Sequence, residues 1–442
     1  MNNHNGAMIR MMPDGTEKQY NPFTGTEVWH IPGRKNRPIF TGIPDTAQRI
    51  KGDHRDVCNF CPARYLMTPP EKARLVLQDG QWVTQSRLSP VEVVKGTAEF
   101  RRIPNLFEIV SINYWKKNFQ YHLNEKNRAW KENYLSLPEG RQHVLEIVNL
   151  KLRYSGLSDA EIGAVTEDEK IELADAFFGG GHELIVPRRH FVEGAEYDTQ
   201  LASSGELSSE EHYQYFRFTI EAMNEVYADN RYCRYVAVYQ NWRKEAGASF
   251  DHLHTQIVGL DEWGVSLERE LKLMVTNRNM YNEYAANFAA LNNNVICEND
   301  HAMAFVDLGH RYPTIAIYSK SVNCRPREHT PAELRGVSDL VHAIHAATGS
   351  QISCNEEWYY MPNDSIIPIP WHILIKWRVN IPAGFEGGTK IYVNPMSLSE
   401  LRDKLVPRLF DLRAKGKLGW LRIAEECPVK PNSLKYYQRT IE

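Results

Sequence analysis

The chain repeats one order of elements, strand, helix, strand, strand, and this repeat constrains the fold more than any other feature. In the first half "HELIVPRRH" leads through "ELSSEEHYQYFRFTIEAMNEVY" to "RYVAVYQNW" and a strand with two histidines. In the second half "TIAIYSKSV" leads through "REHTPAELRGVSDLVHAIHAATG" to "EEWYYMPND" and "IPWHILIKW". A chain of 442 residues exceeds what one hydrophobic core usually supports. We therefore predict two related halves, residues 1–260 and 261–442.

Two capping boxes, Ser208 with Glu211 and Ser397 with Glu400, mark the starts of expected helices, and Thr330 with Pro331 and Glu333 marks a third. The segment 113–178 interrupts the strand rhythm with polar, charged and helix-prone sequence such as "WKKNFQYHLNEKNRAWKENYL". We interpret it as a helical insertion in the first half.

A pair of cysteines, Cys58 and Cys61 in "DVCNFCPARYL", has the spacing with which two thiolates reach one metal ion from a tight turn. The alternatives are a redox pair, which the surrounding sequence does not favour, and two unligated cysteines. A metal site needs further ligands, and His190 and His252 are the candidates. The seven cysteines are odd in number and scattered, unlike the framework of a disulfide-rich secreted domain.

Two histidines and a glutamine, His252, His254 and Gln256, alternate in the strand-like stretch "SFDHLHTQIVGL". Alternate side chains of a strand point to the same face, so the three are expected to lie together. They could instead be edge residues facing water or core histidines satisfied by neighbours. The added glutamine and the preceding "GAS" loop favour a functional site.

The overall composition is that of an ordinary globular protein. A formal net charge of −3 gives no support for a general nucleic-acid or membrane binder. The opening "MNNHNGAMIRMMPDG" has no apolar core segment, and no apolar run is long enough to span a bilayer. We expect a cytoplasmic protein.

Five stretches carry a resemblance to a known family: "CNFCPARYLMTPPE", "FRRIPNLFEIV", "HELIVPRRH", "QNWRKEAGASFDHLHTQIVG" and "AGFEGGTKIYVNP". In this order they resemble the galactose-1-phosphate uridylyltransferase family, a branch of the histidine-triad superfamily. The resemblance implies an α+β fold of two fused histidine-triad-like halves, in which helices pack on antiparallel sheets. The second half would lack the full triad.

The same resemblance implies nucleotidyl transfer between a nucleotide sugar and a sugar 1-phosphate, with UMP as the expected group. His254 would form a covalent nucleotidyl-histidine, while its other ring nitrogen donates to the backbone carbonyl of His252. Further residues would bind the phosphates, namely Gln256, Ser249, Asn241 and Gly247. Asn105 and Phe107 would hold the nucleoside.

For the metal, the resemblance implies one structural zinc ion per chain, bound by Cys58, Cys61, His190 and His252. His182 and His54 are nearby substitutes for His190. "WHILIKW" has only one histidine, so no second metal is expected there.

The segment "AGFEGGTKIYVNP" is implied to reach the triad of a second subunit in a homodimer. Phe385, Glu386, Lys390 and Tyr392 would then contact the sugar or its phosphate. A surface turn with a solvated lysine is the simpler alternative.

Two other functions compete with transfer to a sugar 1-phosphate. One is phosphorolysis or hydrolysis of a nucleotide sugar or dinucleoside polyphosphate, which uses the same His254 chemistry with a different acceptor. The other is a nucleotide-binding protein without turnover, which an intact set of His254, Ser249 and Gln256 disfavours. The sequence leaves the base, the sugar and the acceptor open.

Overall fold

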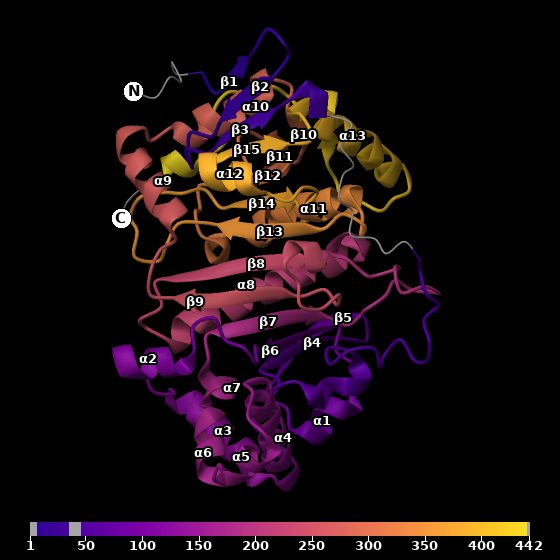
Figure 1. Ribbon diagram of the computed structural model, residues 1–442, viewed down its shortest axis with the longest axis vertical. Coiled ribbons are helices and arrows are strands. Elements are labelled where there is room, and N and C mark those ends of the chain that lie inside the picture. The colour runs from indigo at the N-terminus through magenta and orange to yellow at the C-terminus, as the bar shows by residue number, and fades with distance from the viewer. Residues whose placement is uncertain (1–6, 35–45, 440–442) are drawn as a thin grey trace.

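A single large sheet runs through the molecule and joins both halves of the chain. The computed structural model describes residues 7–34 and 46–439. The sheet has 12 strands in the order β16-β10-β11-β12-β14-β13-β8-β9-β7-β6-β4-β5, and its neighbouring strands are antiparallel. Figure 1 shows the strands stacked from the second half above to the first half below.

The strands of this sheet are β4 (Ala73–Gln78), β5 (Gln81–Ser86), β6 (Phe100–Pro104), β7 (His182–Pro187), β8 (Tyr235–Trp242), β9 (Thr255–Leu260), β10 (Val295–Glu298), β11 (Ala302–Asp307), β12 (Thr314–Ser319), β13 (Cys354–Tyr359), β14 (His372–Trp377) and β16 (Arg422–Ile423). The main helices are α1 (Pro90–Lys95), α2 (Ile112–Phe119), α3 (Glu125–Ser136), α4 (Pro138–Tyr154), α5 (Asp159–Ala164), α6 (Glu167–Leu173), α7 (Asp175–Gly179), α8 (Ser209–Asp229), α9 (Val265–Thr276), α10 (Asn287–Leu291), α11 (Pro331–Thr348), α12 (Gly384–Thr389) and α13 (Leu398–Ala414).

The strand order is symmetric about the central pair β8 and β13. Moving outward from that pair, β9, β7 and β6 on one side correspond to β14, β12 and β11 on the other. Across the centre, Tyr239 pairs with Glu357 and Asn241 with Asn355. The α+β architecture predicted from the sequence is confirmed, and the sheets of the two halves are continuous with each other.

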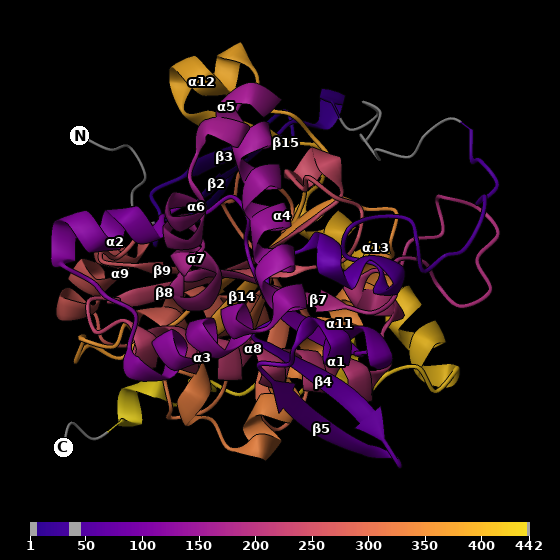
Figure 2. The same ribbon diagram turned by 90° about the horizontal axis from the view of Figure 1, so that it is seen from below.

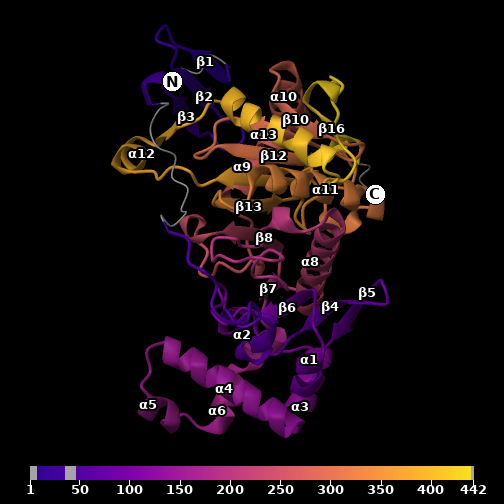
Figure 3. The ribbon, with the colours of Figure 1, turned by 90° about the vertical axis from the view of Figure 1, so that its right-hand side faces the viewer.

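Helices α8 and α11 cover one face of the sheet and pack against each other (Figure 3). The Tyr215 hydroxyl of α8 lies 2.7 Å from Thr255 Oγ1 of β9, and Ser338 of α11 lies 2.8 Å from the His212 ring. The three helix starts predicted from the sequence are confirmed for α8, α11 and α13, and each has a capping box. Residues of β9 therefore alternate between this helical face and the opposite face.

Helices α2 to α7 occupy the segment predicted as a helical insertion and form the end of the molecule beyond β6 (Figures 1 and 2). They enclose a separate hydrophobic cluster that includes Trp115, Trp130 and Phe177. Leu150 and Tyr154 of α4 line one cavity together with Ile103 of β6 and Leu184 of β7, so the insertion borders the first half's open sheet face.

A second, four-stranded sheet brings the start of the chain to its second half. It has the order β1 (Ile9–Met11), β2 (Glu17–Tyr20), β3 (Glu27–His30) and β15 (Ile391–Asn394), with β3 and β15 parallel. Helix α12 precedes β15 and projects from this side (Figure 3). In residues 7–34 and 46–439, no helix has the length and apolar character needed to cross a membrane.

Candidate active site and metal site

Four side chains predicted as metal ligands, Cys58, Cys61, His190 and His252, converge in the first half, with all ligand atoms within 4.8 Å of one another. The two sulfurs are 3.7 Å apart, and each sulfur lies 3.5 to 3.8 Å from the histidine Nδ1 atoms. Tetrahedral zinc bond lengths require separations of about 3.8 Å between sulfurs and about 3.6 Å between sulfur and nitrogen. The four residues thus have the geometry to hold a metal ion, with no position left for substrate.

Neighbouring groups orient these ligands. His252 Nε2 lies 2.7 Å from the carbonyl oxygen of Pro187, so Nε2 carries the proton and Nδ1 is free to bind metal. The hydrogen bond from Cys58, aided by those of the two histidines, lowers the pKa of the Cys61 thiol. The site therefore favours a thiolate, which is the form of cysteine that binds metal.

His254 is held in one tautomer by the backbone of His252. Its Nδ1 lies 2.8 Å from the His252 carbonyl oxygen and must donate to it, which leaves Nε2 with a lone pair. The side chain is 4% exposed, and burial lowers its pKa, so the ring is neutral at physiological pH. Both histidines lie just before β9 and not inside the strand as the sequence suggested, because the chain bends at Asp251 and His252 and the strand begins only at Thr255.

Gln256, within β9, has its orientation fixed by His182, which the sequence indicates only as a substitute metal ligand. The Ile109 N–H donates to His182 Nδ1 at 3.0 Å, so His182 Nε2 carries a proton and donates to Gln256 Oε1, also at 3.0 Å. The Tyr239 hydroxyl lies 3.1 Å from the same oxygen. Burial lowers the pKa of His182 to about 4 and keeps this ring neutral.

This network leaves the amide NH2 of Gln256 as a donor toward open space, with no protein partner among the described residues. The one clue to His182 in the sequence is its place as the polar first residue of a buried strand. Its partnership with Gln256 depends on the pairing of β7 with β9.

A cavity of about 410 Å³ opens beside His254 on the sheet face opposite α8. Five of the predicted site residues line it, namely Asn105, Phe107, Ser249, His254 and Gln256. The rest of the lining is mostly apolar and includes Leu150 and Tyr154 of α4, so the helical insertion contributes one wall. Tyr154 meets Phe107 edge to face at 5.7 Å between ring centroids.

Asn241 and Gly247 lie close to each other, and neither lines this cavity. Gly247 has φ +91°, a backbone conformation that favours glycine, and a Cβ placed there would be 3.9 Å from Asn241 Nδ2. Asn241 Oδ1 accepts a 2.7 Å hydrogen bond from Asn355 of β13. Its amide NH2 is therefore the end that faces the Gly247 loop.

The four residues predicted to contact the acceptor, Phe385, Glu386, Lys390 and Tyr392, lie in the second half, and none of them lines the cavity beside His254. Glu386 accepts the Ala383 N–H at 2.8 Å, and Lys390, with φ +60°, ends α12. Tyr392 is buried in β15. One chain does not bring this segment to His254.

Two solved structures share this fold over most of the chain. One is an ADP-glucose phosphorylase from Arabidopsis thaliana with bound ADP-glucose, 17% identical, with a TM-score of 0.55, covering 88% of this chain and 98% of that one. The other is a GalT-like protein from Arabidopsis thaliana, 16% identical, with a TM-score of 0.53 and the same coverage of both chains. The protein therefore has the GalT-like fold, as the sequence resemblance implied.

The chain belongs to a family described as a domain of unknown function, DUF4921, whose model matches residues 12–436. A comparison with curated proteins gives no match.

Proposed function

We propose that the protein is a nucleotidyltransferase that moves a nucleoside monophosphate through a covalent intermediate on His254. The Nε2 lone pair attacks the α-phosphorus of a nucleotide sugar. The bond between this phosphorus and the oxygen bridging to the β-phosphorus breaks, and sugar 1-phosphate leaves with the electron pair. A phosphate oxygen of the acceptor then attacks the same phosphorus, the P–N bond breaks, and the electron pair returns to Nε2.

The observation that carries this proposal is the hydrogen bond from His254 Nδ1 to the His252 carbonyl at 2.8 Å. It keeps the nucleophilic nitrogen deprotonated beforehand. It also stabilises the positive charge that the ring acquires when phosphorus is attached to Nε2. The Nδ1 proton stays in place throughout, so neither step requires a separate base.

Neutral donors around His254 suit the charge that develops on the phosphate oxygens. The Gln256 amide and the Ser249 hydroxyl line the cavity, and the Asn241 amide lies near Gly247, two residues before Ser249. The apolar wall formed by Phe107, Leu150 and Tyr154 suits a nucleobase. Four Cys and His ligands in tetrahedral geometry favour zinc, one ion per chain, with a structural role.

Phosphorolysis is the second candidate, because one of the two similar structures is an ADP-glucose phosphorylase. It differs from the first only in using inorganic phosphate as the acceptor. The experiment that tests both candidates uses two donors, UDP-glucose and ADP-glucose, each carrying a label in its α-phosphate. Binding of each donor is measured together with transfer of the label to the protein.

We expect at least one donor to label the protein and to release glucose 1-phosphate in equal amount. The labelled protein is then mixed separately with galactose 1-phosphate, inorganic phosphate or buffer. Release by the sugar phosphate alone supports transferase activity, and release by phosphate alone supports phosphorolysis. Tight binding of every donor without label in the protein would identify a nucleotide-binding protein without turnover and refute the proposal.

We further propose that α12 of a second copy supplies the acceptor contacts in a homodimer. Lys390 is exposed and Phe385 is half exposed, so both are available to another chain. Lys390→Ala and Glu386→Gln should slow transfer from the His254 adduct by about 10- to 100-fold, the value of one charge-assisted hydrogen bond. Glutamine can still accept the Ala383 N–H, so the helix start is retained.

The rate of adduct formation should stay within about twofold of the wild-type rate in both variants. The reason is that the donor binds beside His254, in the first half of the chain, and not at α12. Lys404→Ala, at an exposed lysine of α13, is the matched control. Stopped-flow measurement of each half-reaction, with sedimentation to determine the oligomer, tests the assignment. Equal slowing of both half-reactions, or a fully active monomer, would contradict it.

A further inference from the structure

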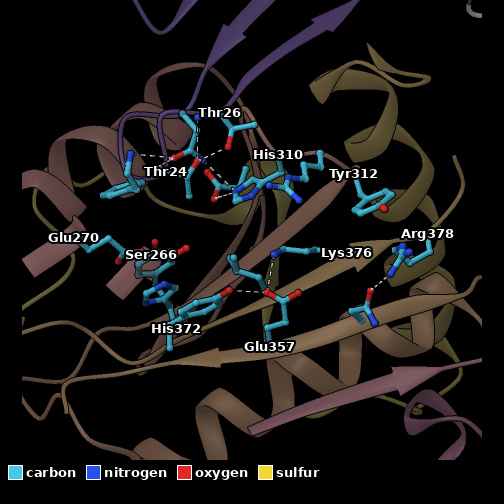
Figure 4. A pocket seen from close by; sticks show the side chains of 18 residues that line it. Thr24, Thr26, Ser266, Glu270, His310, Tyr312, Glu357, His372, Lys376 and Arg378 are labelled. Atoms are coloured by element: carbon cyan, nitrogen blue, oxygen red, sulfur yellow. Dashed lines mark hydrogen bonds and ion pairs between the residues drawn. The ribbon is translucent and has the colours of Figure 1, made fainter. Parts of the chain in front are cut away.

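A second cavity of about 420 Å³ lies on the same sheet face, in the second half of the molecule (Figure 4). Cross-strand pairing connects the two sites, because Gln256 pairs with Tyr239, Tyr239 with Glu357, and Glu357 with Leu374. Gln256 lines the first cavity, and Glu357 and Leu374 line the second. The second cavity thus occupies the position related to the first by the symmetric strand order.

His372, in the floor of this cavity, is built like His254. Its Nδ1 lies 2.8 Å from the carbonyl oxygen of Pro370, two residues earlier, just as His254 uses His252. The ring stacks between Tyr318 and Tyr359, with centroids 4.5 and 5.2 Å away. It is 4% exposed, and burial lowers its pKa to about 4, so Nε2 is an uncharged acceptor without a partner in the described structure.

Glu270 of α9 lies at the same end of the cavity as His372 and Ser266 (Figure 4). It is 5% exposed, and its Oε2 accepts the Tyr281 hydroxyl at 2.5 Å. Burial raises the pKa of this carboxyl to about 7. Its Oε1 has no protein partner within residues 7–34 and 46–439, so this end offers hydrogen bonds with little fixed charge. His372 Nε2 and the Glu270 carboxyl are therefore suited to hydrogen bonds with the hydroxyl groups of a ligand.

Arg378 and Tyr312 lie at the other end of the cavity, with Lys376 and Glu357 between the two ends (Figure 4). His372 and Lys376 are four residues apart on β14, or about 13 Å. Lys376 forms an ion pair with Glu357 at 2.6 Å. The third acid of the lining, Asp307, contacts the His310 ring at 2.7 Å.

Two arginines of the lining have no carboxylate partner among the described residues. Arg378 bonds the amide oxygen of Asn355 at 2.8 Å and lies over the Tyr312 ring. Arg311 is exposed and lies over the Tyr392 ring, 4.9 Å from its centroid. These guanidinium groups can bind an anion, and phosphate matches their paired N–H donors.

We propose that this cavity is a second ligand site, which binds a small hydroxyl-rich phosphate ester of the sugar phosphate class. Its hydroxyls contact His372 and Glu270, and its phosphate contacts Arg311 and Arg378. The ligand forms no covalent bond to the protein. Its binding does not depend on the reaction at His254.

Isothermal titration calorimetry with glucose 1-phosphate, glucose 6-phosphate and ribose 5-phosphate tests this site. Glucose alone and inorganic phosphate alone are the controls for the sugar and the phosphate of each ester. We expect at least one ester to bind at least 10-fold more tightly than either part. Arg311→Gln should weaken that binding by at least 10-fold, because it removes a charged donor at the surface. His372→Phe should do the same while keeping the ring between Tyr318 and Tyr359.

Ser249→Ala is the comparison that tells the two cavities apart. It should leave binding at the second cavity unchanged and weaken any separate event beside His254. Circular dichroism and the unfolding temperature confirm that each variant is folded. The proposal is overturned if no ester binds at millimolar concentration. It is equally overturned if binding survives both Arg311→Gln and His372→Phe, or depends on Ser249 alone.

Discussion

Replacing His254 with alanine should abolish nucleotide labelling of the protein and slow overall transfer by about 10⁴-fold or more, the cost of losing a covalent nucleophile. The variant should keep its fold, because the side chain makes one hydrogen bond within residues 7–34 and 46–439, to the His252 carbonyl. Intact mass spectrometry after incubation with UDP-glucose or ADP-glucose measures the adduct. The adduct should be stable to base and labile to acid, as a phosphoramidate is.

Two further variants serve as a rescue experiment and a control. His254→Gly with added imidazole should recover turnover, because the small molecule can occupy the vacated space and attack phosphorus. His122→Ala, at an exposed histidine near the start of α3, is the matched control and should label normally. A His254→Ala enzyme that still carries the label, or turns over at the normal rate, would rule out this mechanism.

Cys58→Ser should remove the metal and destabilise the first half together. Metal binding to a Cys and His site is coupled to folding, so we expect a loss of several kcal/mol, on the order of 10 °C in Tm for a chain of this size. Adduct formation should fall as well, because His252, one of the four proposed metal ligands, also supplies the carbonyl that orients His254. Elemental analysis should give one zinc per wild-type chain.

Cys427→Ser is the control for this prediction, since Cys427 is also partly buried but lies outside the metal cluster. It should leave metal content unchanged. A Cys58→Ser protein with full metal content and an unchanged Tm, or wild-type protein purified without chelator that holds no metal, would contradict the assignment.

Local sequence signals predicted much of this fold. Capping boxes depend on residues three apart, and the strand repeat depends on short apolar runs, so both can be read without knowing the tertiary structure. The Cys58 and Cys61 spacing indicated a metal for the same reason. The two distant ligands, His190 and His252, became specific only through the resemblance.

Features that depend on distant strands coming together were beyond sequence reasoning. His182 acts on Gln256 because β7 pairs with β9, and nothing near His182 in the chain indicates that pairing. The second cavity is lined by segments near residues 21–26, 266–270, 307–312, 318 and 355–378, which only the folded chain brings together. The bend before β9 was missed because apolar alternation continues through it. The roles proposed for the α12 segment stay predictions.

The symmetric sheet has a consequence for how the protein unfolds. β8 and β13 are interior strands that hydrogen-bond to each other, and α8 packs on α11 across the same boundary. Cutting the chain after residue 260 would turn both strands into long unprotected edges and expose the buried faces of both helices. Edges of this kind promote aggregation. We therefore expect the two halves to unfold as one cooperative unit, and we expect a fragment that holds the metal-site candidates and His254 to be insoluble when produced alone.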